Sequence, residues 1–178
     1  MWRSFVLKVT LFVVMVTLCV GVPIVNAEGV NWTSTTSANL YSVDMIGSSD
    51  GWAVGPSGAL IRWDGTDWIN VTSPIPADFH DVFMVNSTDG WIVGQIYDGM
   101  YTFGITIHWD GTAWIPAMVS GPEIDSLSSV SIVSASDGWA VGNAGTVIHW
   151  DGTEWTSVPS PTTNTLLSVY MVNSSDSW

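Results

Sequence analysis

The sequence predicts an all-β protein, a β-propeller built from four-stranded blades. Three observations predict this fold. A Ser/Thr-Asp-Gly-Trp motif recurs about every 40 residues, an Asp-Gly-Thr-x-Trp motif follows each complete copy, and short apolar runs alternate with turn residues between them. Repeats of this length made of short strands are typical of propellers, in which each repeat forms one blade. Beyond residue 27 no apolar pattern with a period of 3.6 residues is sustained, so almost no helix is expected there.

The first 27 residues have the pattern of an export signal. Arg3 and Lys8 precede the apolar run 9–22, and small residues at 25–27 offer a cleavage site. The alternative is an uncleaved N-terminal anchor, although the run is at the short limit for a membrane span. We therefore expect a secreted or cell-surface protein, linked to a membrane only through this segment if it is not cleaved.

The charge of the chain excludes two classes of partner. Its net charge is −13, with 3 basic and 16 acidic residues, and cleavage after residue 27 leaves Arg62 as the only Lys or Arg. Nucleic acids and anionic lipids are bound by clustered Lys and Arg, which are missing here. The single cysteine, Cys19, lies within the signal, so no disulfide is expected in the mature chain.

The repeats divide the rest of the chain into blades. The predicted segments are 28–39, with a strand at 31–37 that completes the last blade of a ring; 40–79, blade 1; 80–126, blade 2; 127–165, blade 3; and 166–178, the start of a truncated blade 4. Because four blades are the usual minimum for a ring, we expect the chain to be a fragment of a longer protein.

Within blade 1 the expected strands are 42–46, 52–55, 59–63 and 68–72. Asp50-Gly51 is expected to form the first tight turn, because glycine tolerates the positive φ that such hairpins require. Pro56-Ser57-Gly58 and Asp64-Gly65-Thr66 are the next turns. Four strands in about 40 residues match one propeller blade.

Blade 2 contains seven extra residues between its second and third strands, around 95–104. The insertion carries Tyr97, Tyr101 and Phe103. It is interpreted either as a binding loop or as an extended hairpin that packs on itself. The sequence leaves both interpretations open.

Two sets of Asp-Gly pairs recur at fixed blade positions, and we assign them a structural role in turns. An aspartate side chain commonly bonds to nearby backbone amides, and recurrence in every repeat argues against a site that a single blade would supply. The pairs are Asp50-Gly51, Asp89-Gly90 and Asp137-Gly138 in the first set, and Asp64-Gly65, Asp110-Gly111 and Asp151-Gly152 in the second.

The tryptophans fall into three register-matched sets, which are expected to pack between neighbouring blades. The members of the second and third sets flank one turn and are expected to pair across it. An aromatic platform for sugars is the alternative. The sets are Trp52, Trp91 and Trp139; Trp63, Trp109 and Trp150; and Trp68, Trp114 and Trp155.

No catalytic, cofactor-binding or metal-binding residues are assigned. His108 and His149 occupy the repeat position of Arg62, and His80 has no partner that the sequence identifies. No zinc spacing, nucleotide-binding glycine motif or nucleophile elbow is present. We therefore expect no metal and no cofactor.

The pattern Gly-Trp-x-Val-Gly-x-x-Gly, followed by Asp-Gly-Thr-x-Trp, at 51–68 and 138–155 resembles the repeats of photosystem II assembly factor-like propellers. These are relatives of the sialidase (BNR/Asp-box) superfamily. The resemblance implies a ring of six to eight blades in the intact protein. Sialidases hold their substrate with three arginines, and residues 28–178 contain only Arg62.

The function expected from the sequence is that of an exported, non-catalytic module that binds a protein or a glycan at the cell surface or outside the cell. The alternative is a fragment of a sialidase-like or other glycosidase propeller, whose catalytic residues would lie in missing blades. Such an enzyme needs two suitably placed carboxylates. The sequence past Trp178 would discriminate between the two.

Overall fold

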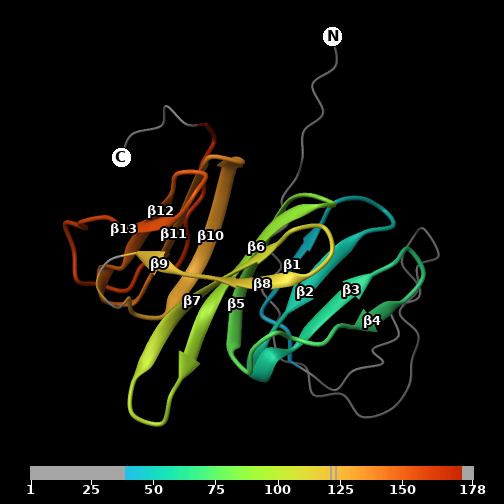
Figure 1. Ribbon diagram of the computed structural model, residues 1–178, viewed down its shortest axis with the longest axis horizontal. Coiled ribbons are helices and arrows are strands. Elements are labelled where there is room, and N and C mark those ends of the chain that lie inside the picture. The colour runs from blue at the N-terminus through green and yellow to red at the C-terminus, as the bar shows by residue number, and fades with distance from the viewer. Residues whose placement is uncertain (1–38, 121, 123, 174–178) are drawn as a thin grey trace. The chain divides into compact units, whose positions relative to one another are not determined.

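The computed structural model describes residues 39–120, 122 and 124–173. The predicted export signal, the closing strand at 31–37 and Trp178 lie outside these residues. Three sheets make up the described part, and its only helical pieces are two three-residue 3-10 turns, η1 (Pro56–Gly58) and η2 (Asn143–Gly145) (Figure 1). None of the helical pieces in this part has the length and apolarity required to cross a membrane. The predicted all-β propeller fold with four-stranded blades is confirmed.

The first sheet has the order β1-β2-β3-β4, with antiparallel neighbours. Its strands are β1 (Ser42–Met45), β2 (Gly51–Val54), β3 (Leu60–Trp63) and β4 (Trp68–Asn70). The turn between β3 and β4 requires a glycine, because Gly65 has φ +99°. This turn places Trp63 directly opposite Trp68.

The second sheet, β5-β6-β7-β8, repeats this order with a longer central hairpin. Its strands are β5 (Asp78–Asn86), β6 (Asp89–Tyr97), β7 (Thr102–Trp109) and β8 (Trp114–Ala117). The pairing of β6 with β7 continues to Tyr97 and Thr102, so the extra residues of the repeat extend the hairpin. Figure 1 shows this hairpin reaching past the neighbouring strands.

The third sheet contains one strand more than the repeat predicts. Its order is β10-β11-β12-β13-β9, with the strands β9 (Val119–Ser120), β10 (Leu127–Ser134), β11 (Asp137–Gly142), β12 (Val147–Trp150) and β13 (Trp155–Ser157). The added strand β9 belongs to the connection that follows β8 and runs parallel to β13. This connection is two residues longer than its counterpart after β4.

The glycines of the first Asp-Gly set do not adopt a positive φ, so the prediction of such a φ in an Asp50-Gly51 turn is wrong. The turn lies one step earlier, where the Ile46 N–H donates to the Asp50 carbonyl (2.9 Å), and Gly51 is the first residue of β2. A Cβ atom at Gly51 would overlap the sulfur of Met45. Glycine therefore leaves room for a side-chain end of the preceding strand, and the same holds for Gly90 and Gly138, which face Met84 and Ile132.

The hydrophobic core lies between neighbouring sheets. One cluster joins the first sheet to the second, another joins the second to the third, and a third cluster packs the segment after the third sheet onto β11. That segment, 166–171, is the predicted start of blade 4; it is not assigned as a strand, but Val169 and Met171 are buried.

Candidate functional site

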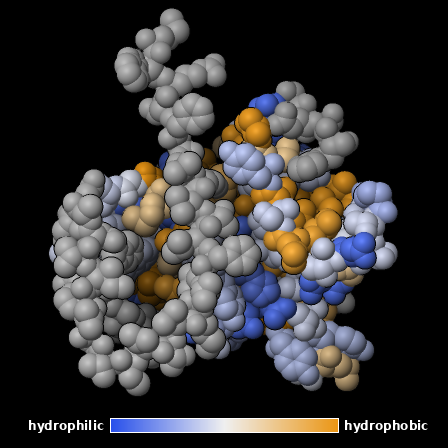
Figure 2. All heavy atoms as spheres, turned by 180° about the vertical axis from the view of Figure 1, so that it is seen from behind, coloured by the Kyte–Doolittle hydropathy of each residue, from blue (hydrophilic) through white to orange (hydrophobic). Residues whose placement is uncertain are grey.

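The tip of the β6–β7 hairpin exposes three large apolar side chains. Tyr97, Met100 and Tyr101 are 66%, 73% and 61% exposed. Phe103, the third aromatic residue of the insertion, is partly buried one residue inside the hairpin and contacts Tyr101 edge-on, with ring centroids 6.3 Å apart. We call Tyr97, Met100 and Tyr101 the hairpin tip; it projects at the lower right in Figure 2.

The hairpin tip is held in one conformation by its own polar groups. The Asp98 carboxylate accepts the backbone N–H groups of Met100 and Tyr101 (both 2.8 Å), and the Tyr97 hydroxyl donates to the Gly99 carbonyl (2.8 Å). These amide donors hold the pKa of Asp98 below its ordinary value of 3.8. The insertion is therefore an extended hairpin with an ordered apolar end, a geometry that also suits a binding loop.

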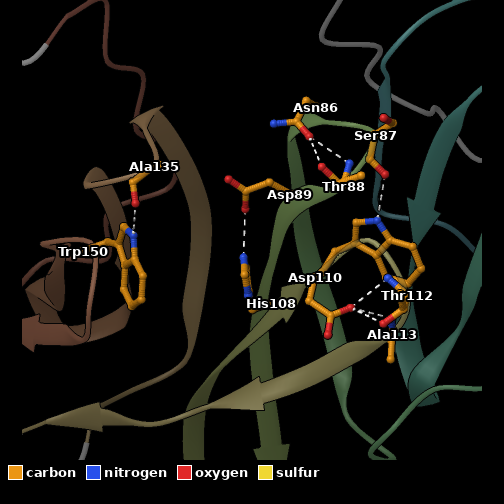
Figure 3. A network of polar contacts seen from close by, with 11 residues as sticks. Asn86, Ser87, Thr88, Asp89, His108, Asp110, Thr112, Ala113, Ala135 and Trp150 are labelled. Carbon is orange, nitrogen blue, oxygen red and sulfur yellow. Dashed lines mark hydrogen bonds and ion pairs between the residues drawn. The ribbon is translucent and has the colours of Figure 1, made fainter.

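The aspartates of the first Asp-Gly set bond to side chains of the neighbouring strand. The sequence had predicted that they bond to nearby backbone amides. Asp89 accepts from His108 Nε2 (2.8 Å), as Figure 3 shows, and Asp50 accepts from Arg62 Nε and Nη2 (3.0 and 3.3 Å). Asp137 and His149 form the third such pair (3.0 Å). The prediction missed these pairs because the partner lies on the neighbouring strand, at a register that local sequence does not reveal.

The aspartates of the second set bond to their own turns. Oδ1 of Asp110 accepts the N–H groups of Thr112 and Ala113 and the Thr112 hydroxyl, all within 2.8 Å (Figure 3). Asp151 is bonded in the same way. The threonine hydroxyl, followed by the amides, lowers the pKa of both carboxyls to about 2. Asp64 accepts only amides, from Thr66 and Asp67, and its pKa is also lowered.

Each of the two interfaces between the three described sheets contains three packed tryptophans. Trp52 of the first sheet lies 4.9 Å from Trp109 and 5.2 Å from Trp114 of the second, measured between ring centroids. The next interface repeats this arrangement with Trp91, Trp150 and Trp155. Trp63 and Trp68 contact each other within the first sheet, and Trp139 contacts His149 within the third. Trp52, Trp109 and Trp114 are at most 6% exposed, so they offer no open platform for a sugar.

A row of hydrogen bonds between side chains and backbone joins the first strands of successive blades. Ser42 of β1 bonds to the N–H of Val82, Asp81 of β5 to that of Val130, and Ser129 of β10 to that of Val169. In each case the acceptor is a side chain of one blade and the donor is the backbone of the next blade. We call these contacts the inner-strand ladder; no motif of the sequence reveals it.

Asp81 is the centre of the inner-strand ladder. Its buried carboxylate accepts the hydroxyls of Ser42 (2.7 Å) and Ser129 (2.9 Å), so it links three blades. Burial raises the pKa of Asp81, although four hydrogen bonds to the carboxylate oppose the change. The adjacent His80 also has a partner that the sequence did not reveal: its Nδ1 lies 2.7 Å from the Leu127 carbonyl.

Among residues 39–120, 122 and 124–173, no three His, Cys, Asp or Glu side chains are grouped in a way that could hold a metal ion. The acidic residues of both recurring sets contact turn amides or a basic side chain of the same sheet.

Solved structures with the same fold support the resemblance inferred from the repeats. YCF48 bound to D1 peptide matches with a TM-score of 0.61 and 20% identity, covering 74% of this chain and 43% of that one. YCF48 from Cyanidioschyzon merolae matches with a TM-score of 0.56 and 16% identity, covering 73% and 42%. A protein of unknown function from Bacteroides thetaiotaomicron matches with a TM-score of 0.55 and 9% identity, covering 78% and 37%.

At these identities the likeness concerns the fold, and the chain spans less than half the length of each of these three structures. The similarity to photosystem II assembly factor propellers is thereby confirmed for the fold. No protein-family model matches the chain, and no curated protein does.

Proposed function

We propose that the chain is part of an exported, non-catalytic β-propeller that binds another protein through the hairpin tip. The observation that carries this proposal is the exposure of Tyr97, Met100 and Tyr101 on a hairpin that only one of the three blades extends. Large apolar side chains exposed together on one element are typical of protein contact sites, and tyrosine is enriched among the residues that dominate binding energy.

The order of the hairpin tip supports binding. Asp98 and the Tyr97 hydroxyl fix the turn before any partner arrives, so little conformational entropy is lost on association. Met100, the most exposed of the three, has a flexible thioether that adapts to protein surfaces, which favours a protein over a glycan. The YCF48 structure with a bound peptide is a precedent for peptide binding by this fold.

The partner is tested with a photo-crosslinking residue at position 101 of the full chain, exposed to surface and secreted fractions of the native organism. We expect a cross-linked protein that disappears when Tyr97→Ser and Met100→Ser are combined in the same chain. A cross-linker at Tyr170, which is 61% exposed elsewhere, is the matched control. Recovery of glycan alone, or of the same protein from both positions, would refute the proposal.

Export is tested separately by the intact mass of the protein isolated from the native organism. A chain that begins at Glu28 supports release after cleavage, and a chain that begins at Met1 supports an anchored protein.

A further inference from the structure

A cavity of about 440 Å³ lies between the first and second sheets. On one side it is lined by Trp52, Arg62 and the connection 71–74, and on the other by Trp109 and 112–114. We call it the Arg62 cleft. Its volume falls within the range of known ligand sites. It is separate from the hairpin tip, none of whose residues lines it.

The next blade interface shows what fills the same place there. Strand β9 lies along β13, with Val119 opposite Trp155 and Ser120 opposite Thr156, and the Ser120 hydroxyl donates to the Glu154 carboxylate. By repeat position, Trp155 corresponds to Trp114 and Glu154 to Ala113, and both counterparts line the Arg62 cleft. The position that the cleft leaves open is thus occupied by an extended backbone segment one blade later.

The shorter connection after β4 adds no strand to the second sheet. It makes a local turn at Ser73, whose hydroxyl donates to the Ile75 carbonyl (2.6 Å), and among the described residues no strand pairs with the outer edge of β8. Pro116 has no N–H to offer an added strand, so pairing at this edge would be as short as the two-residue contact of β9.

Arg62 determines which segment suits the cleft. It is the only Lys or Arg among the described residues. Its guanidinium lies over the rings of Trp52 (5.2 Å) and Trp109 (5.8 Å), and its side chain remains 40% exposed. Asp50 engages Nε and Nη2, so the N–H groups of Nη1 face no acceptor in the described part of the chain. A planar, partly desolvated guanidinium with remaining donors is suited to a carboxylate.

Unpartnered indole groups do not by themselves distinguish the cleft. Nε1 of Trp52 and Trp114 lacks a hydrogen-bond partner, but Nε1 of Trp155 also lacks one beneath β9. The Arg62 cleft differs from the next blade interface in two ways. It has an open volume where that interface has β9, and it has Arg62 where that interface has His108.

From this comparison we propose that the Arg62 cleft binds a short extended peptide that carries a carboxylate. The peptide lies along Trp114 and Ile115 as β9 lies along Trp155 and Thr156, and its carboxylate bonds to Arg62. This is a second binding site, independent of the hairpin tip.

The probes are two sets of hexapeptides, acetylated and amidated at their ends, with the sequence of residues 117–122. In the first set Glu replaces one residue at a time, and in the second set Gln replaces the same residues. Binding to the ¹⁵N-labelled full chain is followed by NMR at the Arg62 Nε–H and the Trp114 indole N–H. We expect at least one Glu peptide to shift both signals and to bind about tenfold tighter than its Gln counterpart, as for a charge-assisted hydrogen bond.

Two variants use residues that the repeats already accept, so folding is preserved. Arg62→His installs the residue of the other two blades, and Ala113→Glu installs the carboxylate of blade 3; each is expected to weaken the Glu peptide about tenfold. The tip variant Tyr101→Ser should bind it like the wild type. Equal binding of the Glu and Gln sets, unchanged binding by Arg62→His, or no shifts at millimolar peptide would overturn the proposal.

Discussion

At the scale of single residues, the turn aspartates show how one hydroxyl sets a pKa. Asp110 accepts a threonine hydroxyl in addition to two amides, whereas Asp64 accepts amides alone. The folded pKa of Asp110, about 2, lies below its ordinary value of 3.8. Its contribution to stability is therefore present above about pH 4 and is lost as the pH falls toward about 2.

We predict that Thr112→Val raises the pKa of Asp110 from about 2 toward 3.8, because the hydroxyl donor is removed while the amides remain. A ¹³C NMR titration of the carboxyl carbon measures this change. Thr66→Val is the matched control, since the Thr66 hydroxyl does not contribute to the lowered pKa of Asp64. Equal changes in the two variants would contradict the assignment.

At the scale of strands, β6 illustrates two reasons for a glycine. A Cβ at Gly90 would meet the flexible end of the Met84 side chain, whereas a Cβ at Gly94 would meet the backbone carbonyl of Asp78. A side-chain end can move aside, but the backbone carbonyl is fixed by the paired strand β5.

We therefore predict that Gly90→Ala lowers the free energy of unfolding by about 1 kcal/mol and Gly94→Ala by about 3 kcal/mol or more. Urea denaturation of both variants measures the difference. Because both glycines lie in β6 and lose the same backbone freedom, a similar cost for the two would show that close packing is not the cause.

The strands illustrate what the sequence can and cannot reveal. The spacing of the Asp-Gly-Trp and Asp-Gly-Thr motifs predicted the sheets, and the pairing of Trp63 with Trp68 followed from their positions on either side of a turn. The bonds of Asp50, Asp89 and Asp137 were missed because they depend on strand register. Strand β9 was missed because its partner belongs to another repeat. The Arg62 cleft was missed because it depends on how neighbouring blades pack at one interface, which the repeat pattern does not reveal.

At the scale of the molecule, Asp81 links three blades through one buried carboxylate. Its folded pKa lies above its ordinary value of 3.8, so the folded protein binds this proton more tightly than the unfolded chain does. The contribution of Asp81 to stability is therefore fully present at low pH and declines as the pH rises through the folded pKa.

Asp81→Ser tests this behaviour, because the other blades carry Ser42 and Ser129 at the same position. We predict that the melting temperature of the wild type, relative to the variant, increases as the pH is lowered from 7 toward 4, because protonation removes the cost of burying the charge. Thermal unfolding followed by circular dichroism measures the difference. If the melting temperatures of the wild type and the variant changed in parallel with pH, Asp81 would have the same pKa in the folded and unfolded chains, and the prediction would be wrong.

The inner-strand ladder has a direction: the side chain that accepts always belongs to the earlier blade, and the backbone that donates belongs to the later one. Each repeat thus carries both halves of the contact on its first strand: in β5, Asp81 accepts from the following blade and the Val82 N–H donates to the preceding one. A duplication of one repeat-length stretch of the gene would insert both halves together, so the array could lengthen without compensating substitutions.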